Sequence, residues 1–86
     1  MKFEVATHLP PEEVIRQAEE FYAQHTGLKV AERGANRLEL SGAIGDAVIK
    51  AYRDHGHTTV SAETNRGVGL DVTDQTLRFL HMIPHV

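Results

Sequence analysis

The chain has 86 residues, no cysteine and a formal net charge of −3 at neutral pH. This length supplies enough apolar surface for one small core and too little for two, and the lack of cysteine excludes disulfides, thiol nucleophiles and cysteine metal clusters. A pI near 6.0 disfavours sequence-independent nucleic-acid binding, which depends on neutralising phosphates, so no nucleic-acid partner is expected.

The first segment alternates apolar and polar residues from Met1 to Leu9, which predicts a half-buried strand over 1–9. This segment lacks the apolar core of a signal peptide, and no stretch of the chain approaches the ~20 apolar residues that cross a bilayer. We therefore expect a cytoplasmic protein with no membrane partner.

A helix is predicted over 11–25. Pro11 suits the first helical turn, and the carboxylates of Glu12 and Glu13 lie where the helix dipole is positive. Apolar residues follow at helical spacing, and Gly27 is expected to end the helix in a left-handed conformation.

The apolar period then changes to two, which predicts four strands with short connections. Glycine and asparagine in Gly34-Ala35-Asn36 tolerate positive φ, which indicates a hairpin turn between the first two of these strands. Short connections favour an antiparallel meander. The predicted strands cover residues 28–31, 37–41, 47–52 and 58–63.

A second helix is predicted over 71–83, with Asp71, Thr73 and Asp74 as candidate caps and Pro84 at its end. The chain is thus expected to form a single α+β domain over 1–86, in the order β-α-β-β-β-β-α. A five-stranded antiparallel sheet with two helices packed on one face buries both apolar helix stripes. Small alanines at positions 47, 51 and 62 would allow a helix to approach the sheet closely.

This order of elements resembles two known folds. The segment Leu9-Pro10-Pro11-Glu12-Glu13-Val14, followed by the strands and the C-terminal helix 71–83, is similar to a shortened helix-grip domain of the START and polyketide-cyclase-like superfamily. The order also resembles a half-domain of the TATA-box-binding protein fold. The helix-grip resemblance implies a curved sheet with the C-terminal helix lying across it and an apolar ligand between them.

The segment Asp54-His55-Gly56-His57 contains the most conspicuous candidate metal ligands. His55 and His57 are two positions apart in the sequence, which places both rings on one side of a strand only where the strand continues through Gly56. A metal site also needs a third or fourth ligand from elsewhere in the chain. The interpretation as a polar hairpin turn is therefore favoured over a metal site, and no cofactor is expected.

The segment Gly42-Ala43-Ile44-Gly45 has the glycine spacing of certain nucleic-acid-binding loops. Such loops lead into a helix N-terminus, whose backbone amides face phosphate. A strand follows here, so the segment is interpreted as a turn or bulge between strands.

The outer face of the sheet, away from the helices, is expected to be mildly basic and to offer an interaction surface. Val48 and Tyr52 give this face an apolar patch. A solvated face of mixed charge is the alternative interpretation. The residues assigned to the interaction surface are Lys29, Arg33, Val48, Lys50 and Tyr52.

Three functions are considered. The first is a non-catalytic domain that holds a small apolar or amphipathic molecule between the C-terminal helix and the sheet. The side chains that would form the wall of this ligand site are also explained by core packing alone. The second is a homodimeric or protein-interaction module that uses the outer face or an edge strand. The third, an enzyme or metal protein using His55 and His57, has no supporting catalytic motif. The candidate ligand wall comprises Phe21, Tyr22, Phe79, Leu80 and Met82.

Overall fold

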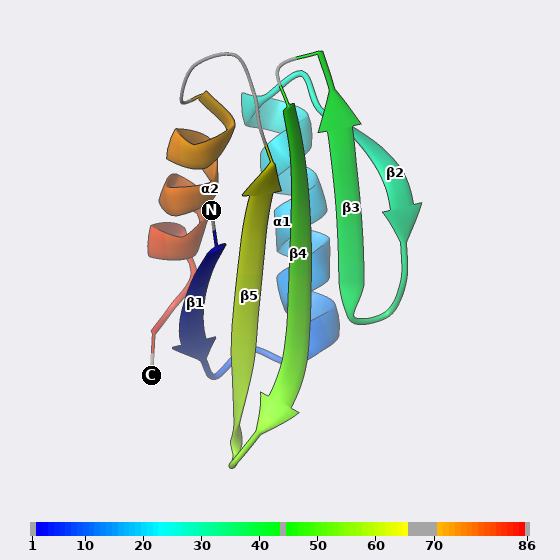
Figure 1. Cartoon of the computed structure of the whole chain (residues 1–86). Coiled ribbons are helices and arrows are strands. Elements are labelled where there is room, and N and C mark those ends of the chain that lie inside the picture. The colour runs from blue at the N-terminus through cyan, green and yellow to red at the C-terminus, as the bar shows by residue number, and fades with distance from the viewer. Residues whose placement is uncertain (1, 44, 66–70, 86) are drawn as a thin grey trace.

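The computed structural model describes residues 2–43, 45–65 and 71–85 of the chain (Figure 1). These residues form the predicted α+β arrangement, with five strands and two helices in the order β-α-β-β-β-β-α. The elements are β1 (Lys2–Thr7), α1 (Pro11–His25), β2 (Lys29–Arg33), β3 (Arg37–Gly42), β4 (Gly45–Asp54), β5 (His57–Asn65) and α2 (Asp71–Met82).

The five strands form one antiparallel sheet in the order β1-β5-β4-β3-β2. Strands β2 to β5 follow one another as the predicted meander. Strand β1, the first in the chain, pairs with β5, the last, so that Lys2 lies opposite Glu63 and Thr7 opposite Thr58. The two edges of the sheet are therefore β1 and β2.

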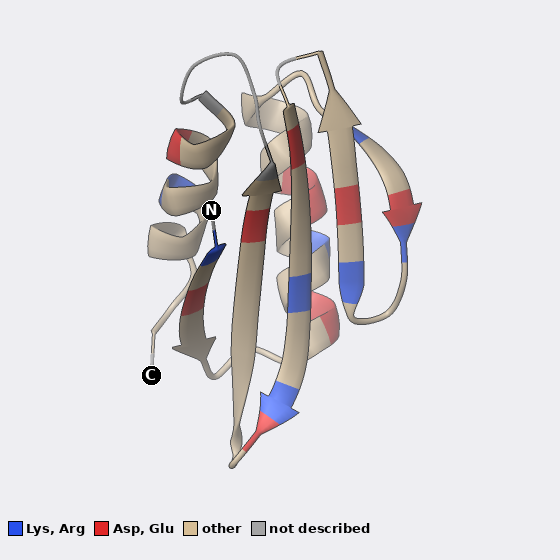
Figure 2. Ribbon diagram, in the orientation of Figure 1, with Lys and Arg blue, Asp and Glu red and all other residues tan. Residues whose placement is uncertain are grey.

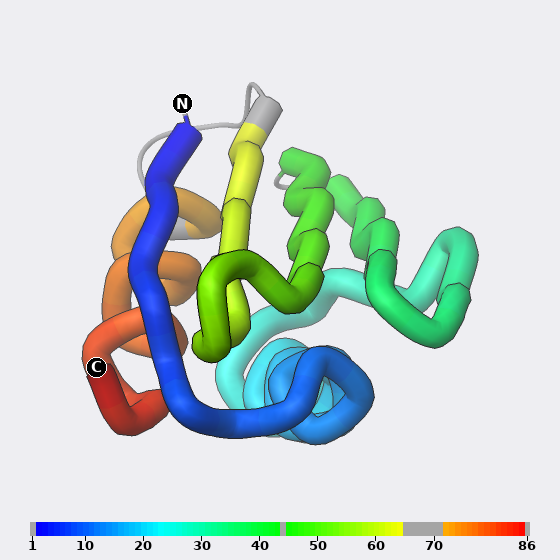
Figure 3. Tube along the Cα trace, turned by 90° about the horizontal axis from the view of Figure 1, so that it is seen from below, coloured from blue at the N-terminus to red at the C-terminus, as the bar shows by residue number. Residues whose placement is uncertain are grey.

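Both helices lie on the same side of the sheet, as predicted, and Figure 3 shows this two-layer arrangement. Helix α1 packs on β3, β4 and β5, and α2 packs on β4, β5 and α1. No described helix covers the opposite side of the sheet. We call that side the open face and the other side the covered face.

Helix α1 has the predicted bounds, but a threonine rather than a glycine ends it. The backbone N–H and the side-chain hydroxyl of Thr26 both donate to the carbonyl of Tyr22, at 3.1 and 2.8 Å. The Thr26 hydroxyl then accepts a hydrogen bond from the backbone N–H of Leu28 at 3.0 Å. These bonds satisfy groups that the helix end leaves free. Gly27 has no positive φ, so the prediction of a left-handed glycine at this helix end is wrong.

The core fills the space between the covered face and the two helices. The predicted alanines at positions 47, 51 and 62 are fully or almost fully buried there, where small side chains allow the helices to approach the strands. The core residues are Val14, Ile15, Ala18, Phe21, Tyr22, Leu28, Leu38, Leu40, Ala47, Ile49, Ala51, Val60, Ala62, Val72, Phe79, Leu80 and Ile83.

Two tight turns fix the register of the central strands. Between β4 and β5, His55 and Gly56 both adopt positive φ, 52° and 86°, as in the two-residue turns that match the twist of a hairpin. Between β3 and β4, Gly42 pairs with Gly45, so the glycine-containing segment is a hairpin connection and leads into a strand. Ile44 of that connection lies outside the described residues.

Candidate functional site

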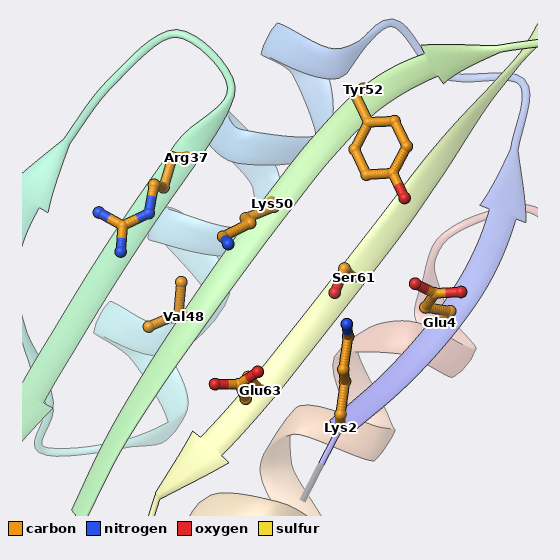
Figure 4. A pocket seen from close by; sticks show the side chains of 8 residues that line it. All are labelled: Lys2, Glu4, Arg37, Val48, Lys50, Tyr52, Ser61 and Glu63. Carbon is orange, nitrogen blue, oxygen red and sulfur yellow. The ribbon is translucent and has the colours of Figure 1, made fainter.

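The open face is polar and carries charges of both signs, which Figure 2 shows interspersed over the strands. At its centre is a hollow of about 220 Å³, which we call the open-face hollow (Figure 4). Residues from four of the five strands line it: Lys2, Glu4, Arg37, Val48, Lys50, Tyr52, Ser61 and Glu63.

The strand register explains why these side chains lie together. Ser61 on β5 lies opposite Glu4 on one neighbouring strand and opposite Lys50 on the other. Lys50 in turn lies opposite Arg37 on β3. Directly opposite residues point to the same face, so one cross-strand row brings a carboxylate, a hydroxyl and two cations to the open face.

The two cations of this row differ in their surroundings. The guanidinium of Arg37 pairs with the carboxylate of Glu32 at 3.0 Å and with that of Glu39 at a shorter separation. The ammonium group of Lys50 forms no ion pair with a described residue, and the residue opposite it, Arg37, is also a cation. Like charges directly opposite each other destabilise a sheet, so the row leaves Lys50 available for an anion.

The adjacent row adds further unpaired charges. Lys2 lies opposite Glu63 in the register, yet neither side chain forms an ion pair with a described residue. Figure 4 shows the Lys2 side chain extending over β5 toward Ser61. Glu4 likewise has no charged partner among the described residues. The hollow therefore contains two lysines and two glutamates whose charges no described neighbour satisfies.

Strand β4 provides an apolar surface beside these charges. Val48, Lys50 and Tyr52 are successive open-face residues of β4, and the Tyr52 side chain stands over the sheet (Figure 4). Tyr52 is 43% exposed, whereas Ser61 next to it in the hollow is only 7% exposed. The lining as a whole is mostly polar, so the hollow offers a ligand charged and hydroxyl groups with a smaller apolar surface beside them.

The structure brings three of the predicted interaction-surface residues, Val48, Lys50 and Tyr52, into the hollow. Lys29 lies opposite Ser41 on the same face, but on the edge strand β2 and outside the hollow. The alternating pattern of segments 1–9 and 58–63 already indicates that Lys2, Glu4 and Glu63 point away from the helices. Their place beside β4 follows from the pairing of β1 with β5, which the local pattern does not determine.

The prediction that Arg33 points to the open face is wrong. A register shift between Val30 and Glu32 reverses the alternation of β2, so Arg33 lies opposite the buried Leu38. Its guanidinium pairs with Glu19 of α1 at 2.6 Å. Glu32 takes its place on the open face, which removes the excess of positive charge expected there.

The predicted ligand wall separates into two parts. Phe21, Tyr22, Phe79 and Leu80 belong to the core, and the ring centres of Phe21 and Phe79 are 5.6 Å apart. Met82 is 53% exposed and is not part of that cluster. The four core side chains pack against one another and their neighbours, which agrees with their alternative interpretation as core residues.

Tyr22 carries the hydroxyl that links the two helices. Its hydroxyl and that of Thr76 on α2 form a short hydrogen bond in the core. Burial raises the pKa of Tyr22 to about 12, although the bond to Thr76 acts in the opposite direction.

A second hollow, of about 440 Å³, lies between the end of α1 and strands β2 and β3. Its walls are largely aliphatic, with Leu28, Val30 and Leu40 among them, and it is wide open to solvent. The carboxylate of Glu19 at its rim is already paired with Arg33. We place the candidate site in the open-face hollow because it is the less open of the two and because its charged side chains can orient a ligand.

His55 and His57 lie at the hairpin that connects β4 and β5. The Nδ1 atom of His55 lies 2.6 Å from a carboxylate oxygen of Asp54, and the side chain is 88% exposed. Within residues 2–43, 45–65 and 71–85, no group of three or more histidine, aspartate or glutamate side chains is placed to hold a metal ion. The segment has the geometry of the polar hairpin turn that was favoured.

Neither the family models nor the curated proteins compared with this chain match it. Among the described helices, none has the length and apolar character needed to cross a membrane. Proposals about function therefore depend on the geometry of this chain alone.

Proposed function

We propose that this protein is a non-catalytic binding domain that holds a small amphipathic molecule in the open-face hollow. The observation that carries the proposal is a set of four charged side chains without an ion-pair partner among the described residues, next to two apolar side chains of β4: Lys2, Glu4, Lys50 and Glu63 beside Val48 and Tyr52. All four side chains are exposed, so a ligand of complementary charge can form ion pairs with them without breaking any ion pair between described residues.

The size and chemistry of the hollow set the class of ligand. At about 220 Å³ the hollow lies below the roughly 300–1,000 Å³ of sites for drug-sized molecules, so it fits a small metabolite. Its lining offers a ligand ion pairs, hydrogen bonds and apolar contact. These are the interactions by which a binding domain recognises a small molecule.

This proposal keeps the amphipathic ligand expected from the sequence and moves it from the covered face to the open face. The space between α2 and the sheet contains Phe79 and Leu80, both almost completely buried. A ligand that binds on the open face displaces no core side chain. The cytoplasmic location expected from the sequence is retained as part of this proposal.

The proposal is tested by titrating isotope-labelled protein with a library of small amino acids, nucleobases, aromatic acids and amines, and recording amide chemical shifts. We expect at least one compound to shift amides of β1, β4 and β5. Lys50→Ala should weaken that binding at least about tenfold, because it removes a charged partner.

Arg53→Ala is the matched control, because Arg53 is an exposed cation of the same strand and does not line the hollow. It should leave the affinity unchanged. Hits that shift only amides near Phe79 or Val30, equal binding to Lys50→Ala, or a library without any hit would each overturn the proposal.

A second candidate function is homodimerisation through the open face, and the register gives it specific support. A two-fold axis parallel to the strands, between β4 and β5, places β1 of one copy over β3 of the other. Glu4 then faces Arg37 of the second copy, and Lys2 faces Glu39 of the second copy. This arrangement is self-complementary, as a two-fold interface requires.

Edge pairing through β2 is a less suitable route to a dimer. The strand contains the register shift after Val30 and exposes Lys29, Glu32 and Arg33. Bulges and charges of this kind protect an edge against pairing with another sheet.

Sedimentation equilibrium of the wild type and of charge-reversal variants tests the dimer. Glu4→Lys and Arg37→Glu should each weaken a dimer, and the double variant should recover most of the loss because the opposed charges are exchanged. A wild type that stays monomeric at millimolar concentration, or a double variant weaker than both single variants, excludes this candidate.

A further inference from the structure

We infer that the ligand of the open-face hollow is a small zwitterion, with an ammonium group and a carboxylate on a short apolar body. This inference rests on the proposed function and specifies its ligand class. It follows from which charges in the hollow lack a partner, and from how the strands place them.

The charges that lack a partner are balanced in sign. Arg37 is satisfied by Glu32 and Glu39, which leaves Lys2 and Lys50 against Glu4 and Glu63. A simple anion would satisfy lysines and leave both carboxylates unpaired, and a simple cation would do the reverse. Because an uncompensated charge covered by a ligand is costly, a molecule with both charges fits this lining best.

The register separates the two signs along one row. Glu4 on β1 and Lys50 on β4 lie on either side of Ser61 on β5. Two strand spacings, roughly 10 Å, separate their backbones. Figure 4 shows Lys50 directed toward β3 and Lys2 extending toward Ser61, so this pose requires Lys50 to turn toward Ser61 and Lys2 to move aside. An ammonium group of the ligand then meets Glu4, its carboxylate meets Lys50, and the Ser61 hydroxyl donates to the carboxylate.

The apolar body of the ligand has its own place next to this row. Tyr52 follows Lys50 on the open face of β4 and Val48 precedes it, so the carboxylate end lies between two apolar side chains. An aromatic body gains additional contact with the Tyr52 ring. An aromatic amino acid is therefore the simplest molecule with all three features.

The test compares three probes that share one aromatic body: L-phenylalanine, phenethylamine without the carboxylate, and 3-phenylpropanoate without the ammonium group. Binding is measured by calorimetry and located by amide chemical shifts. We expect phenylalanine to bind at least about tenfold more tightly than either analogue, because each analogue leaves one charge in the hollow unpaired.

Two conservative variants assign the ends of the ligand. Lys50→Met should remove the preference for phenylalanine over phenethylamine, and Glu4→Gln should remove the preference over 3-phenylpropanoate. Arg53→Met, outside the hollow, should preserve both preferences. A structural role of Lys50 or Glu4 alone would change all three affinities equally.

The outcomes distinguish this inference from the proposed function. Equal binding of 3-phenylpropanoate and phenylalanine identifies an anion site and overturns the zwitterion, while the binding domain stands. No binding of any of the three probes also overturns the zwitterion, even where other library compounds bind in the hollow. Only a library with no compound bound there overturns the proposed function as well.

Discussion

The two faces of the sheet carry side chains of different chemistry, although they come from the same strands. On β4, Ala47, Ile49 and Ala51 point to the helices and are buried, whereas Val48 and Lys50 between them point to the open face. The covered face therefore determines stability through packing, and the open face has charges that packing does not use. Alternation along a strand separates the residues that hold the fold from those available for binding.

The largest loss of stability is expected on the covered face, from removal of the buried Phe79 ring of α2. Phe79→Ala removes a fully buried ring that contacts Phe21 and Tyr22, and we expect the free energy of unfolding to fall by about 3–5 kcal/mol. Met82→Ala, at an exposed position of the same helix, is the control and should change it by less than about 0.5 kcal/mol. Urea denaturation measures both, and similar losses would contradict the core assignment.

The hydroxyl link between the helices should have the next largest effect. Tyr22→Phe leaves the buried hydroxyl of Thr76 without its partner, which should lower stability by about 1–3 kcal/mol at neutral pH. The ring itself is retained, so the loss reports the hydrogen bond. An unchanged midpoint of urea denaturation would show that Thr76 has another partner.

The same tyrosine should make stability depend on alkaline pH. Its pKa is raised from 10.0 to about 12 in the folded protein, so the unfolded chain releases the proton first. The stability that the raised pKa of Tyr22 gives to the folded protein is complete below pH 10 and is lost as pH rises from 10 to about 12. Wild type should therefore lose stability relative to Tyr22→Phe in that interval, and parallel curves for the two proteins would contradict the raised pKa.

Thr7 on β1 and Thr58 on β5 lie opposite each other, and replacing each of them should change the stability by a smaller amount, in opposite directions. The hydroxyl of Thr58 has no hydrogen-bond partner within the described part of the chain, so Thr58→Val should raise stability by about 1 kcal/mol. The Thr7 hydroxyl accepts from the backbone N–H of Leu9 at 3.2 Å, so Thr7→Val should lower it by about 1 kcal/mol. Thermal unfolding of both variants checks the signs, and a loss in each would contradict the unpaired hydroxyl.

The smallest effect on stability is expected from the centre of the open face. Lys50→Ala removes a cation that faces Arg37 and has no described ionic partner, so stability should change by less than about 0.5 kcal/mol. The same substitution should weaken ligand binding strongly. A large loss of stability from this variant would show that Lys50 serves the fold, and that the faces are less separate than the packing indicates.

The fold was predictable because its patterns are local. Proline and acidic residues at the start of α1, and the change from helical to alternating spacing at Leu28, lie within short segments of sequence. Paired strands extend beyond the predicted 47–52 and 58–63, because the two-residue turn at His55 and Gly56 allows pairing up to Asp54 and His57.

The candidate site was predictable only in part, for two physical reasons. Val48, Lys50 and Tyr52 share one strand, so alternation alone places them together. Lys2 reaches the same hollow through the pairing of β1 with β5, a contact distant in sequence. Arg33 was misplaced because one extra residue in β2 reverses every later side chain, and no local pattern marks that residue.

The position of β1 at the edge of the sheet, paired with β5, has a consequence for how the chain folds during synthesis. During synthesis β1 leaves the ribosome before β2, β3, β4 and its partner β5, so β1 cannot pair until the meander has been made. Closing this long loop costs entropy before any contact repays it, which favours late docking of β1. The hollow includes Lys2 and Glu4 of that strand, so late docking of β1 would complete the hollow only after the meander has formed.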